Sequence, residues 1–356
     1  MDSAAIDLFC GIGGLTKGLS LSGISVTAGI DIDASCRFAY EKNNNAKFIN
    51  GDVTSINGEQ IESLYPENVI RILVGCAPCQ PFSKYTNRYR KTGSTDNKWG
   101  LLYSFSRLIQ EITPEIISME NVPELENKSV FDDFVSTLRK LKYHISWTIV
   151  YCPDYGVPQS RKRLVLLASL LGEINLIAPL YNAENSPTVR KAIGHLPVLK
   201  NGEQDTNDPL HISCRLSKLN LKRIKQSVPG GTWRDWDKEL QLKCHKKKSG
   251  KTYPSVYGRM SWDEPSPTIT TQFYGYGNGR FGHPEQDRAL SLREGAILQS
   301  FPLDYIFFDN DHPSSRRELG IHIGNSVPVE LGKAIGLSIQ EHLQEVQKNG
   351  TFKEKI

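Results

Sequence analysis

A cysteine at position 79 has the surroundings of a nucleophile. It lies in the run Gly75-Cys76-Ala77-Pro78-Cys79-Gln80-Pro81-Phe82-Ser83. The apolar stretch 69–74 before it predicts a buried strand, which Gly75 and Pro78 end in a loop. Open α/β sheets bind their ligands at the carboxyl ends of strands, so the thiol is placed to meet one. Because a thiolate is a strong nucleophile at neutral pH, the run indicates covalent chemistry.

Two later runs carry polar groups that could share this site. Glu120-Asn121-Val122 follows the apolar stretch 115–119, and a carboxyl group at the tip of a buried strand can act as a proton donor. The alternative is a surface carboxylate or a charge at a helix N-terminus. In Gln159-Ser160-Arg161-Lys162-Arg163, alternation puts Arg161 and Arg163 on one side of an extended backbone. Two guanidinium groups can hold a phosphate or a carbonyl oxygen, whereas the alternative is a basic strand edge that resists aggregation.

A glycine turn, Phe9-Cys10-Gly11-Ile12-Gly13-Gly14, lies between a predicted strand and a predicted helix. Glycines there let the backbone approach a ligand closely. Thr16 stands where a dinucleotide fingerprint has its third glycine, so that fingerprint is incomplete. Asp31 and Asp52 end the next two strands and suit a ribose and an exocyclic amine. A single nucleoside such as S-adenosylmethionine fits better than a dinucleotide; the alternative is a structural turn with capping aspartates.

The element pattern predicts an α/β fold with a doubly wound, mostly parallel sheet. Strands are expected at 4–9, 26–30, 47–49, 69–74, 115–119, 146–151 and 164–168, and helices at 14–21, 34–43, 102–112 and 130–141. A helix after Pro328 has apolar residues at helical spacing and should return to the sheet. We therefore expect a discontinuous large domain, 1–178 and 322–356, and a smaller domain at 179–321.

Charge is concentrated in one segment. Residues 215–259 hold 13 Lys or Arg and three acidic residues, whereas the rest of the chain holds 30 basic and 36 acidic residues. Trp233, Trp236, Tyr253 and Tyr257 are interleaved with these charges. The pattern favours nucleic-acid binding over a merely solvated basic face, because each neutralised phosphate releases counterions.

Composition excludes several classes of protein. The chain has 356 residues, of which 38% are hydrophobic and 23% charged, which is typical of a globular protein of two domains. No apolar run approaches the roughly 18 residues of a membrane span, and the N-terminus has no signal-peptide pattern. Seven cysteines without framework spacing indicate reduced thiols in the cytosol. We expect no metal, because Cys76 and Cys79 lack a second pair and Cys244-His245 cannot close a zinc site.

Together the runs are far more specific than any one alone. The order of Phe9-x-Gly11-x-Gly13-Gly14, Pro78-Cys79-Gln80, Glu120-Asn121-Val122 and Gln159-x-Arg161-x-Arg163 resembles that of the cytosine-C5 DNA methyltransferases of bacterial restriction-modification systems. The runs 288–302 and 324–328 are similar to two later blocks of that family. The resemblance covers the chain apart from the variable region 180–258. It implies a Rossmann-like methyltransferase fold that uses S-adenosylmethionine, with a smaller target-recognition domain.

The resemblance also implies a mechanism. Cys79 would add to C6 of a cytosine flipped out of duplex DNA, and Glu120 would hold N3 and the 4-amino group. C5 would then take the methyl group, and loss of the C5 proton and of Cys79 would restore the ring. Arg163 would contact the base oxygen, Arg161 would support the pocket, and Asn121 would order the loop.

The resemblance assigns further residues to the cofactor and to DNA. The implied cofactor residues are Phe9, Gly11, Gly13, Gly14, Asp31, Ile32, Asp52, Val53, Pro78, Leu102, Asn325 and Val327. Ile32 departs from an aromatic that some members place against adenine. The segment 83–99 resembles a loop that closes over DNA, and we predict that it is mobile without DNA. The expected DNA contacts are Gln80, Ser83, Lys84, Arg88, Arg90, Lys91, Arg234, Lys246, Lys247 and Arg259.

The expected partner is duplex DNA with a short specific target, with functional pairing to a restriction endonuclease. The protein is expected to be a monomer in the bacterial cytosol or nucleoid. Three alternatives stay open. An RNA (tRNA) cytosine-C5 methyltransferase would share the catalytic residues, although the long basic segment favours DNA. A non-catalytic DNA-binding regulator would not need Cys79, Glu120 and Arg163, and a nicotinamide-dependent oxidoreductase is disfavoured by Thr16.

Overall fold

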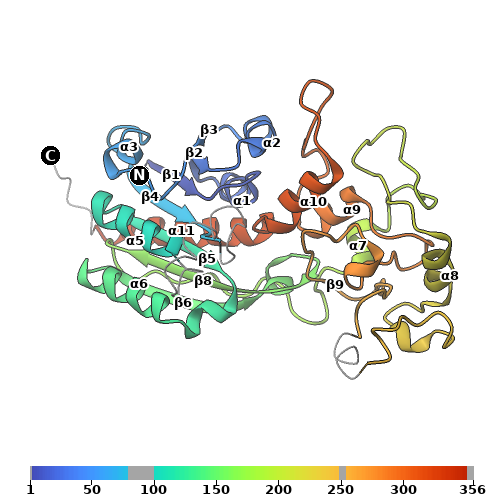
Figure 1. Cartoon of the computed structure of the whole chain (residues 1–356). Helices are drawn as coiled ribbons and strands as arrows, with labels where there is room; N and C mark the ends of the chain where they lie inside the picture. The colour runs from blue at the N-terminus through green and yellow to red at the C-terminus, as the bar shows by residue number, and fades with distance from the viewer. Residues whose placement is uncertain (1, 79–99, 248–253, 351–356) are drawn as a thin grey trace, which may run out of the picture. The chain divides into compact units, whose positions relative to one another are not determined.

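The computed structural model describes residues 2–78, 100–247 and 254–350, and contacts divide the chain into two compact units (Figure 1). The first unit comprises Met1–Tyr151, Lys162–Pro179 and Val327–Ile356, and the second comprises Cys152–Arg161 and Leu180–Ser326. Unlike the expected division, residues 152–161 and 322–326 belong to the second unit. The reason is local: β7 (Gln159–Ser160) pairs with β9 (Ser266–Pro267), and α10 (Arg316–Asn325) continues past residue 321.

A seven-stranded sheet forms the centre of the first unit, in the order β3-β2-β1-β4-β5-β8-β6. Its strands are β1 (Ser3–Leu8), β2 (Ser25–Asp31), β3 (Lys47–Asn50), β4 (Ile70–Gly75), β5 (Ile116–Asn121), β6 (His144–Tyr151) and β8 (Lys162–Ser169). The pairs β1·β2, β1·β4, β2·β3 and β4·β5 are all parallel. The expectation of a mostly parallel sheet is therefore confirmed.

Strand β8 is the exception, because it runs antiparallel to both β5 and β6. Only residues 152–161 separate β6 from β8, and a parallel return needs a crossover of about a dozen residues or more. A reversed strand brings its first residues, not its last, to the edge where β5 ends. Asn121 pairs with Leu164, so Arg163 arrives beside Glu120.

Helices of the first unit pack against the sheet and against one another. They are α1 (Gly14–Leu21), α2 (Arg37–Asn43), α3 (Gly58–Glu62), α5 (Gly100–Ile112), α6 (Ser129–Lys140) and α11 (Val329–Lys348), with 3-10 turns at Ala34–Cys36 and Pro123–Asn127. Phe105 of α5 and Phe134 of α6 have ring centroids 5.7 Å apart and pack in the core with Leu73 and Ile117 of the central strands.

The last helix, α11, packs along α1 within the first unit. This approach requires glycine at position 18, because a Cβ there would overlap the backbone of Val329, Gly332 and Lys333. With any larger residue at position 18, the two helices could not pack as closely as they do. The beginning and the end of the described chain thus share one packed unit.

The second unit is built mainly from loops around short elements. Its helices are α7 (Val189–Ile193), α8 (Lys218–Gln226), α9 (Leu292–Leu298) and α10, with 3-10 turns at Cys152–Tyr155, Trp233–Asp235 and Tyr276–Asn278. A fully buried ion pair joins Arg288 to Glu294 at 2.7 Å. Although burial raises the pKa of the Glu294 carboxyl, the Arg288 charge brings it to about 2. None of the described helices is long and apolar enough to cross a lipid bilayer.

Candidate active site

Glu120, near the carboxyl end of β5, is 2% exposed and is contacted at both carboxyl oxygens. Arg163 Nε lies 2.8 Å from Oε1 as an ion pair, and Cys76 Sγ donates a hydrogen bond to Oε2 over 2.7 Å. Burial raises the pKa of Glu120, and the Arg163 charge and the Cys76 thiol oppose part of that rise. The carboxyl group therefore keeps its proton to a higher pH than an exposed glutamate, as a proton donor requires.

Asn121 ties the exit of β4 to β5. Its side chain is buried, with Nδ2 donating to the carbonyl oxygen of Ala77 at 3.0 Å and Oδ1 accepting from the Val122 amide at 2.8 Å. Gly75 pairs with Met119, so β4 and β5 end side by side. The chain that leads to Cys79 is thus held at the edge of the sheet where Glu120 lies.

Several predicted residues lie outside the described part of the chain. They are the expected nucleophile and the expected DNA contacts of the loop after it: Cys79, Gln80, Ser83, Lys84, Arg88, Arg90 and Lys91. The predicted loop 83–99 lies there as well. Pro78, half-buried, is the last described residue before them.

The two arginines of the run 159–163 have different surroundings. Arg163 belongs to β8 and meets Glu120, whereas Arg161 lies between β7 and β8, in the second unit. The expectation of a continuous extended segment that carries both on one side is therefore corrected, because the strand is interrupted at Arg161.

Arg161 belongs instead to a buried amide network. One of its terminal nitrogens donates to Gln299 Oε1 at 3.3 Å, and Gln159 Nε2 donates to the same oxygen at 2.8 Å. Gln299 Nε2 in turn donates to the carbonyl oxygen of Ile323 at 2.8 Å. The same nitrogen lies 3.3 Å from the carbonyl oxygen of Gly324, so one glutamine joins the sequence runs 159–163, 288–302 and 324–328.

The glycine turn between β1 and α1 has a left-handed backbone at Phe9, Gly11 and Gly13, with φ of 61°, 51° and 86°. The Gly11 amide donates to Asp31 Oδ2 at 2.8 Å, which fastens the turn to the end of β2. A Cβ at Gly11 would meet no atom within 4 Å, so the space over this glycine is open. Gly14 follows as the first residue of α1.

The neighbouring residues fit an adenosine group. Asp31 is the half-buried last residue of β2. Asp52 follows β3, and its Oδ1 accepts from the amide and hydroxyl of Thr54 at 2.9 and 2.8 Å. A carboxylate accepts hydrogen bonds through both oxygens, which is the chemistry that a ribose hydroxyl or an amine requires. Ile32 is 43% exposed, which offers an apolar surface to a base. The open glycine turn and these carboxylates therefore suit S-adenosylmethionine.

The other expected cofactor residues differ in exposure. Val53 and Leu102 are buried in the first unit, and Val327 is 7% exposed there. Asn325, at the last position of α10, is exposed and belongs to the second unit.

A buried polar cluster beneath the glycine turn was missed by sequence reasoning. Thr16 Oγ1 donates to Asp7 Oδ2 at 2.7 Å and lies 3.1 Å from the Tyr40 hydroxyl. Burial raises the pKa of Asp7 to about 7, although the Thr16 hydrogen bond opposes the rise. Thr16 therefore binds a buried carboxyl group instead of completing a dinucleotide turn. An aspartate inside the apolar run 4–8 was the available signal.

Of the aromatic residues of the basic segment, Tyr253 lies outside the described residues, and Trp233, Trp236 and Tyr257 form a core and not a stacking surface. Trp233 and Trp236 are 5% and 4% exposed, and the His245 ring stacks on Trp233 with centroids 4.2 Å apart. Tyr257 packs edge-on against Trp236. These rings pack inside the second unit and are not available to stack on bases. Of the two sequence features that favoured nucleic-acid binding, only the positive charge remains.

The expected DNA contacts of the second unit divide into exposed and buried residues. Arg234, Lys246 and Lys247 are exposed. Arg259 is 5% exposed, and its Nε donates to the carbonyl oxygens of Ile224 and Ser227 at 3.1 and 2.9 Å. The other guanidinium nitrogens bond to the backbone at 283 and 286 and to the carboxylate at 287. The prediction that Arg259 contacts DNA is therefore wrong, because its donors are taken up inside the unit.

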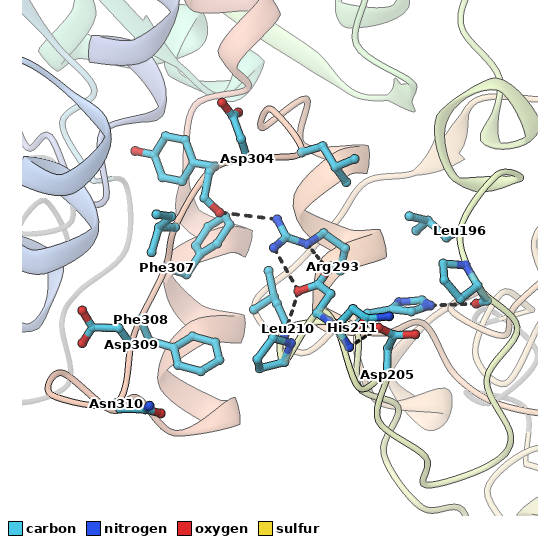
Figure 2. A pocket seen from close by; sticks show the side chains of 17 residues that line it. Leu196, Asp205, Leu210, His211, Arg293, Asp304, Phe307, Phe308, Asp309 and Asn310 are labelled. Carbon is cyan, nitrogen blue, oxygen red and sulfur yellow. Dashed lines mark hydrogen bonds and ion pairs between the residues drawn. The ribbon is translucent and has the colours of Figure 1, made fainter.

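A hollow of about 640 Å³ in the second unit has none of the predicted site residues among its described lining (Figure 2). Arg293 extends across it, with Nε bonded to Asp208 at 2.6 Å and a terminal nitrogen 3.4 Å from the carbonyl oxygen of Tyr305. The lining of the hollow combines apolar side chains with several carboxylates, among them Asp205 and Asp304. Negative charge of this kind does not suit a phosphate backbone.

Comparisons with known proteins agree over nearly the whole chain. The family model "C-5 cytosine-specific DNA methylase" matches residues 3–341. The chain is 53% identical to the Type II methylase M.HgiDII of Herpetosiphon aurantiacus, with 97% of each chain covered. It is 30% identical to the Type II methyltransferase M.Eco47II of Escherichia coli, over 96% of this chain and 80% of the other.

Solved structures agree in fold. The Entamoeba histolytica methyltransferase EhMeth superposes with a TM-score of 0.63 at 18% identity, over 96% of this chain and 99% of the other. With the parallel sheet, the open glycine turn and the buried Glu120 beside Arg163 already in place, the family match over residues 3–341 completes the assignment. The chain belongs to the C-5 cytosine-specific DNA methylases, enzymes that use S-adenosylmethionine to methylate cytosine in DNA.

Proposed function

We propose that Cys79 is the nucleophile of this enzyme and that Glu120 and Arg163 hold the target cytosine. The observation that carries the proposal is the buried Glu120 carboxyl group, with Arg163 at one oxygen and a raised pKa, at the end of the strand beside β4. A cytosine reaches such a site only when it leaves the base stack. The Cys79 thiolate then adds to C6, which makes C5 nucleophilic.

Glu120 acts as the proton donor of the addition step. Negative charge develops at N3 as the Cys79–C6 bond forms, and a protonated carboxyl group can donate to that atom. Arg163, beside Glu120, is placed to donate to the base oxygen. When bound, S-adenosylmethionine supplies the methyl group that C5 receives. Loss of the C5 proton then expels Cys79 as a thiolate and restores the ring.

We propose that the glycine turn 11–14 and Asp31 receive the cofactor, with Asp52, Ile32, Val53, Leu102 and the remaining expected residues around it. Asn121 keeps the chain before Cys79 in place through its bond to Ala77. Arg161 acts through Gln299 and supports the pocket from within its amide network. The exposed Arg234, Lys246 and Lys247 support a target-recognition role for the second unit.

We further propose that the protein is the modification enzyme of a Type II restriction-modification system in the bacterial cytosol or nucleoid. Relatives named as Type II methylases support this, one of them at 53% identity. The endonuclease partner would cleave the same short duplex target. A monomer suffices, because one chain carries all the residues proposed for catalysis.

The decisive experiment measures methyl transfer and adduct formation together. Labelled S-adenosylmethionine is supplied with unmethylated genomic duplex DNA or with tRNA, and bisulfite sequencing locates the product. DNA should be labelled and tRNA should not. On DNA made with 5-fluorocytosine, the protein should form a stable covalent adduct, because fluorine cannot leave as a proton does.

Two variants give this experiment its controls. Cys79→Ser should lower the transfer rate by about a thousandfold or more, because a serine hydroxyl is a far weaker nucleophile than a thiolate. It should also form no adduct. Cys214→Ala, which removes a half-buried thiol of the second unit, should behave as wild type. A Cys79→Ser variant that methylates DNA at the wild-type rate would contradict the proposal, and labelling of tRNA alone would overturn the assigned substrate.

A further inference from the structure

Cys76 contacts the Glu120 carboxyl group from the neighbouring strand. It is half-buried at the exit of β4, and its Sγ lies 2.7 Å from Glu120 Oε2. The contact follows from strand register, because Gly75 pairs with Met119 and residues 76 and 120 come next on the two strands. A thiol at position 76 therefore meets the carboxyl group as long as the two strands keep their pairing.

The two carboxyl oxygens of Glu120 are in different situations. Oε2 accepts the Cys76 hydrogen bond, whereas Oε1 is buried and faces the Arg163 guanidinium group. Arg163 Nε lies 2.8 Å from Oε1 and forms an ion pair with the carboxyl group. Arg163 and Cys76 are the charged and titratable groups of the described chain that act on this carboxyl group. Because a carboxyl oxygen has two lone pairs, Oε1 can still meet a ligand beside Arg163 while the thiol holds Oε2.

We propose that Cys76 is a positioning residue of the methyl-transfer reaction, whose thiol holds Glu120 Oε2 and so presents Oε1, beside Arg163, to the target cytosine. This inference rests on the proposed function of Glu120. It concerns a residue distinct from the nucleophile Cys79, three positions later in the chain.

The physical reason is the freedom of a glutamate side chain. The terminal torsion of glutamate is broad, so an unheld carboxyl group rotates and presents its proton in many directions. A donor at Oε2 restricts that rotation, and a group placed in advance stabilises developing charge most effectively. A protonated thiol is a weak and uncharged donor, so it orients the group without binding it as strongly as a cation would.

The thiol also sets the pH at which Glu120 loses its proton. Donation from Cys76 favours the ionised carboxylate and so opposes the effect of burial on the pKa of Glu120. Without that donor the pKa of Glu120 rises further. Because Glu120 works in its protonated form, activity falls on the alkaline side of the pH profile, and that fall should move to higher pH when the donor is removed.

The test compares single-turnover methyl transfer to duplex DNA across pH for wild type, Cys76→Ser and Cys76→Ala. Cys76→Ala should slow the step by about three- to tenfold, as expected for loss of one hydrogen bond to a carboxyl group, with little change in the KM for DNA. Its alkaline limb should lie at higher pH than that of wild type. Cys76→Ser keeps a donor and should restore most of the rate and the wild-type limb. Cys214→Ala is the control for removal of a thiol elsewhere.

Thermal unfolding and S-adenosylmethionine binding confirm that each variant is folded. Equal rates and equal pH profiles for Cys76→Ala and wild type would overturn the role of Cys76. So would an equal loss in both variants without a shifted limb, which a packing defect would produce. If either of these outcomes is found while wild type labels DNA, only the role of Cys76 fails and the proposed function stands. If wild type labels no DNA, the proposed function fails, and the role of Cys76 with it.

Discussion

A carboxyl group buried below the glycine turn makes stability depend on pH. Asp7 is 1% exposed and has a pKa of about 7, whereas an aspartate in an unfolded chain titrates near 4. Between these values the folded protein holds a proton that the unfolded chain has released. The contribution of Asp7 to the free energy of unfolding should therefore fall as pH rises from about 4 to about 7 and stay low above it.

Replacement of this residue gives a direct test. Asp7→Asn cannot ionise but can still accept the Thr16 hydrogen bond. Between pH 5 and pH 8 the wild type should lose about 2 kcal/mol more unfolding free energy than the variant, as measured by urea unfolding. A constant difference between the two proteins at both pH values would show that Asp7 titrates as an ordinary aspartate.

At the scale of residues, the sequence predicted best the side chains that stand at the ends of apolar strands. Glu120 and Asn121 stood at the tip of an apolar run, and they lie at the end of β5 with Glu120 beside Arg163. The position of Arg161 could not be predicted, because it depends on the pairing of β7 with β9. Strand β9 lies more than a hundred residues later in the chain. Asp7 was passed over because one acidic residue in a hydrophobic run carries no spacing signal.

At the scale of elements, contact between α1 and α11 depends on glycine. A methyl group at position 18 would overlap backbone atoms of Val329, Gly332 and Lys333, which cannot turn aside as a side chain can. Gly18→Ala should therefore lower the unfolding free energy by about 1–3 kcal/mol, even though alanine is the better helix former. Chemical denaturation measures this loss.

The matched control is Gly100→Ala in α5. A Cβ at that position would meet nothing within 4 Å, so the variant should be neutral or slightly more stable. Similar losses in both variants would show that glycine is not needed for the packing of the two helices.

The strands of the first unit were foreseen better than their directions. Apolar runs predicted each strand of the sheet, and the bounds differ by a residue or two at most positions. The reversal of β8 was not predicted, because direction depends on what fills the connection. The ten residues between β6 and β8 have no helical period, and this alone could have argued against a parallel return.

For the molecule as a whole, the excess of basic residues in the second unit predicts salt-dependent DNA binding. Replacing Arg234, Lys246 and Lys247 together by glutamine should weaken binding. It should also reduce the slope of log affinity against log salt by up to about 3, near 0.9 for each lost phosphate contact. Fluorescence anisotropy with a labelled duplex at several salt concentrations measures both quantities.

Arg259→Gln separates charge from structure in the same assay. Its guanidinium group is held inside the second unit, so the variant should unfold at a lower temperature and keep the wild-type salt slope. A reduced slope for Arg259→Gln, or an unchanged slope for the triple variant, would contradict the assignment of these residues.

The packing of α11 on α1 has a consequence for biosynthesis. The face of α1 that meets α11 is made before the second unit, but α11 leaves the ribosome only after the whole second unit has been made. For that interval the nascent chain exposes apolar surface that the finished enzyme buries, and such surface invites aggregation or chaperone binding. The first unit therefore reaches its folded packing only after α11 has left the ribosome.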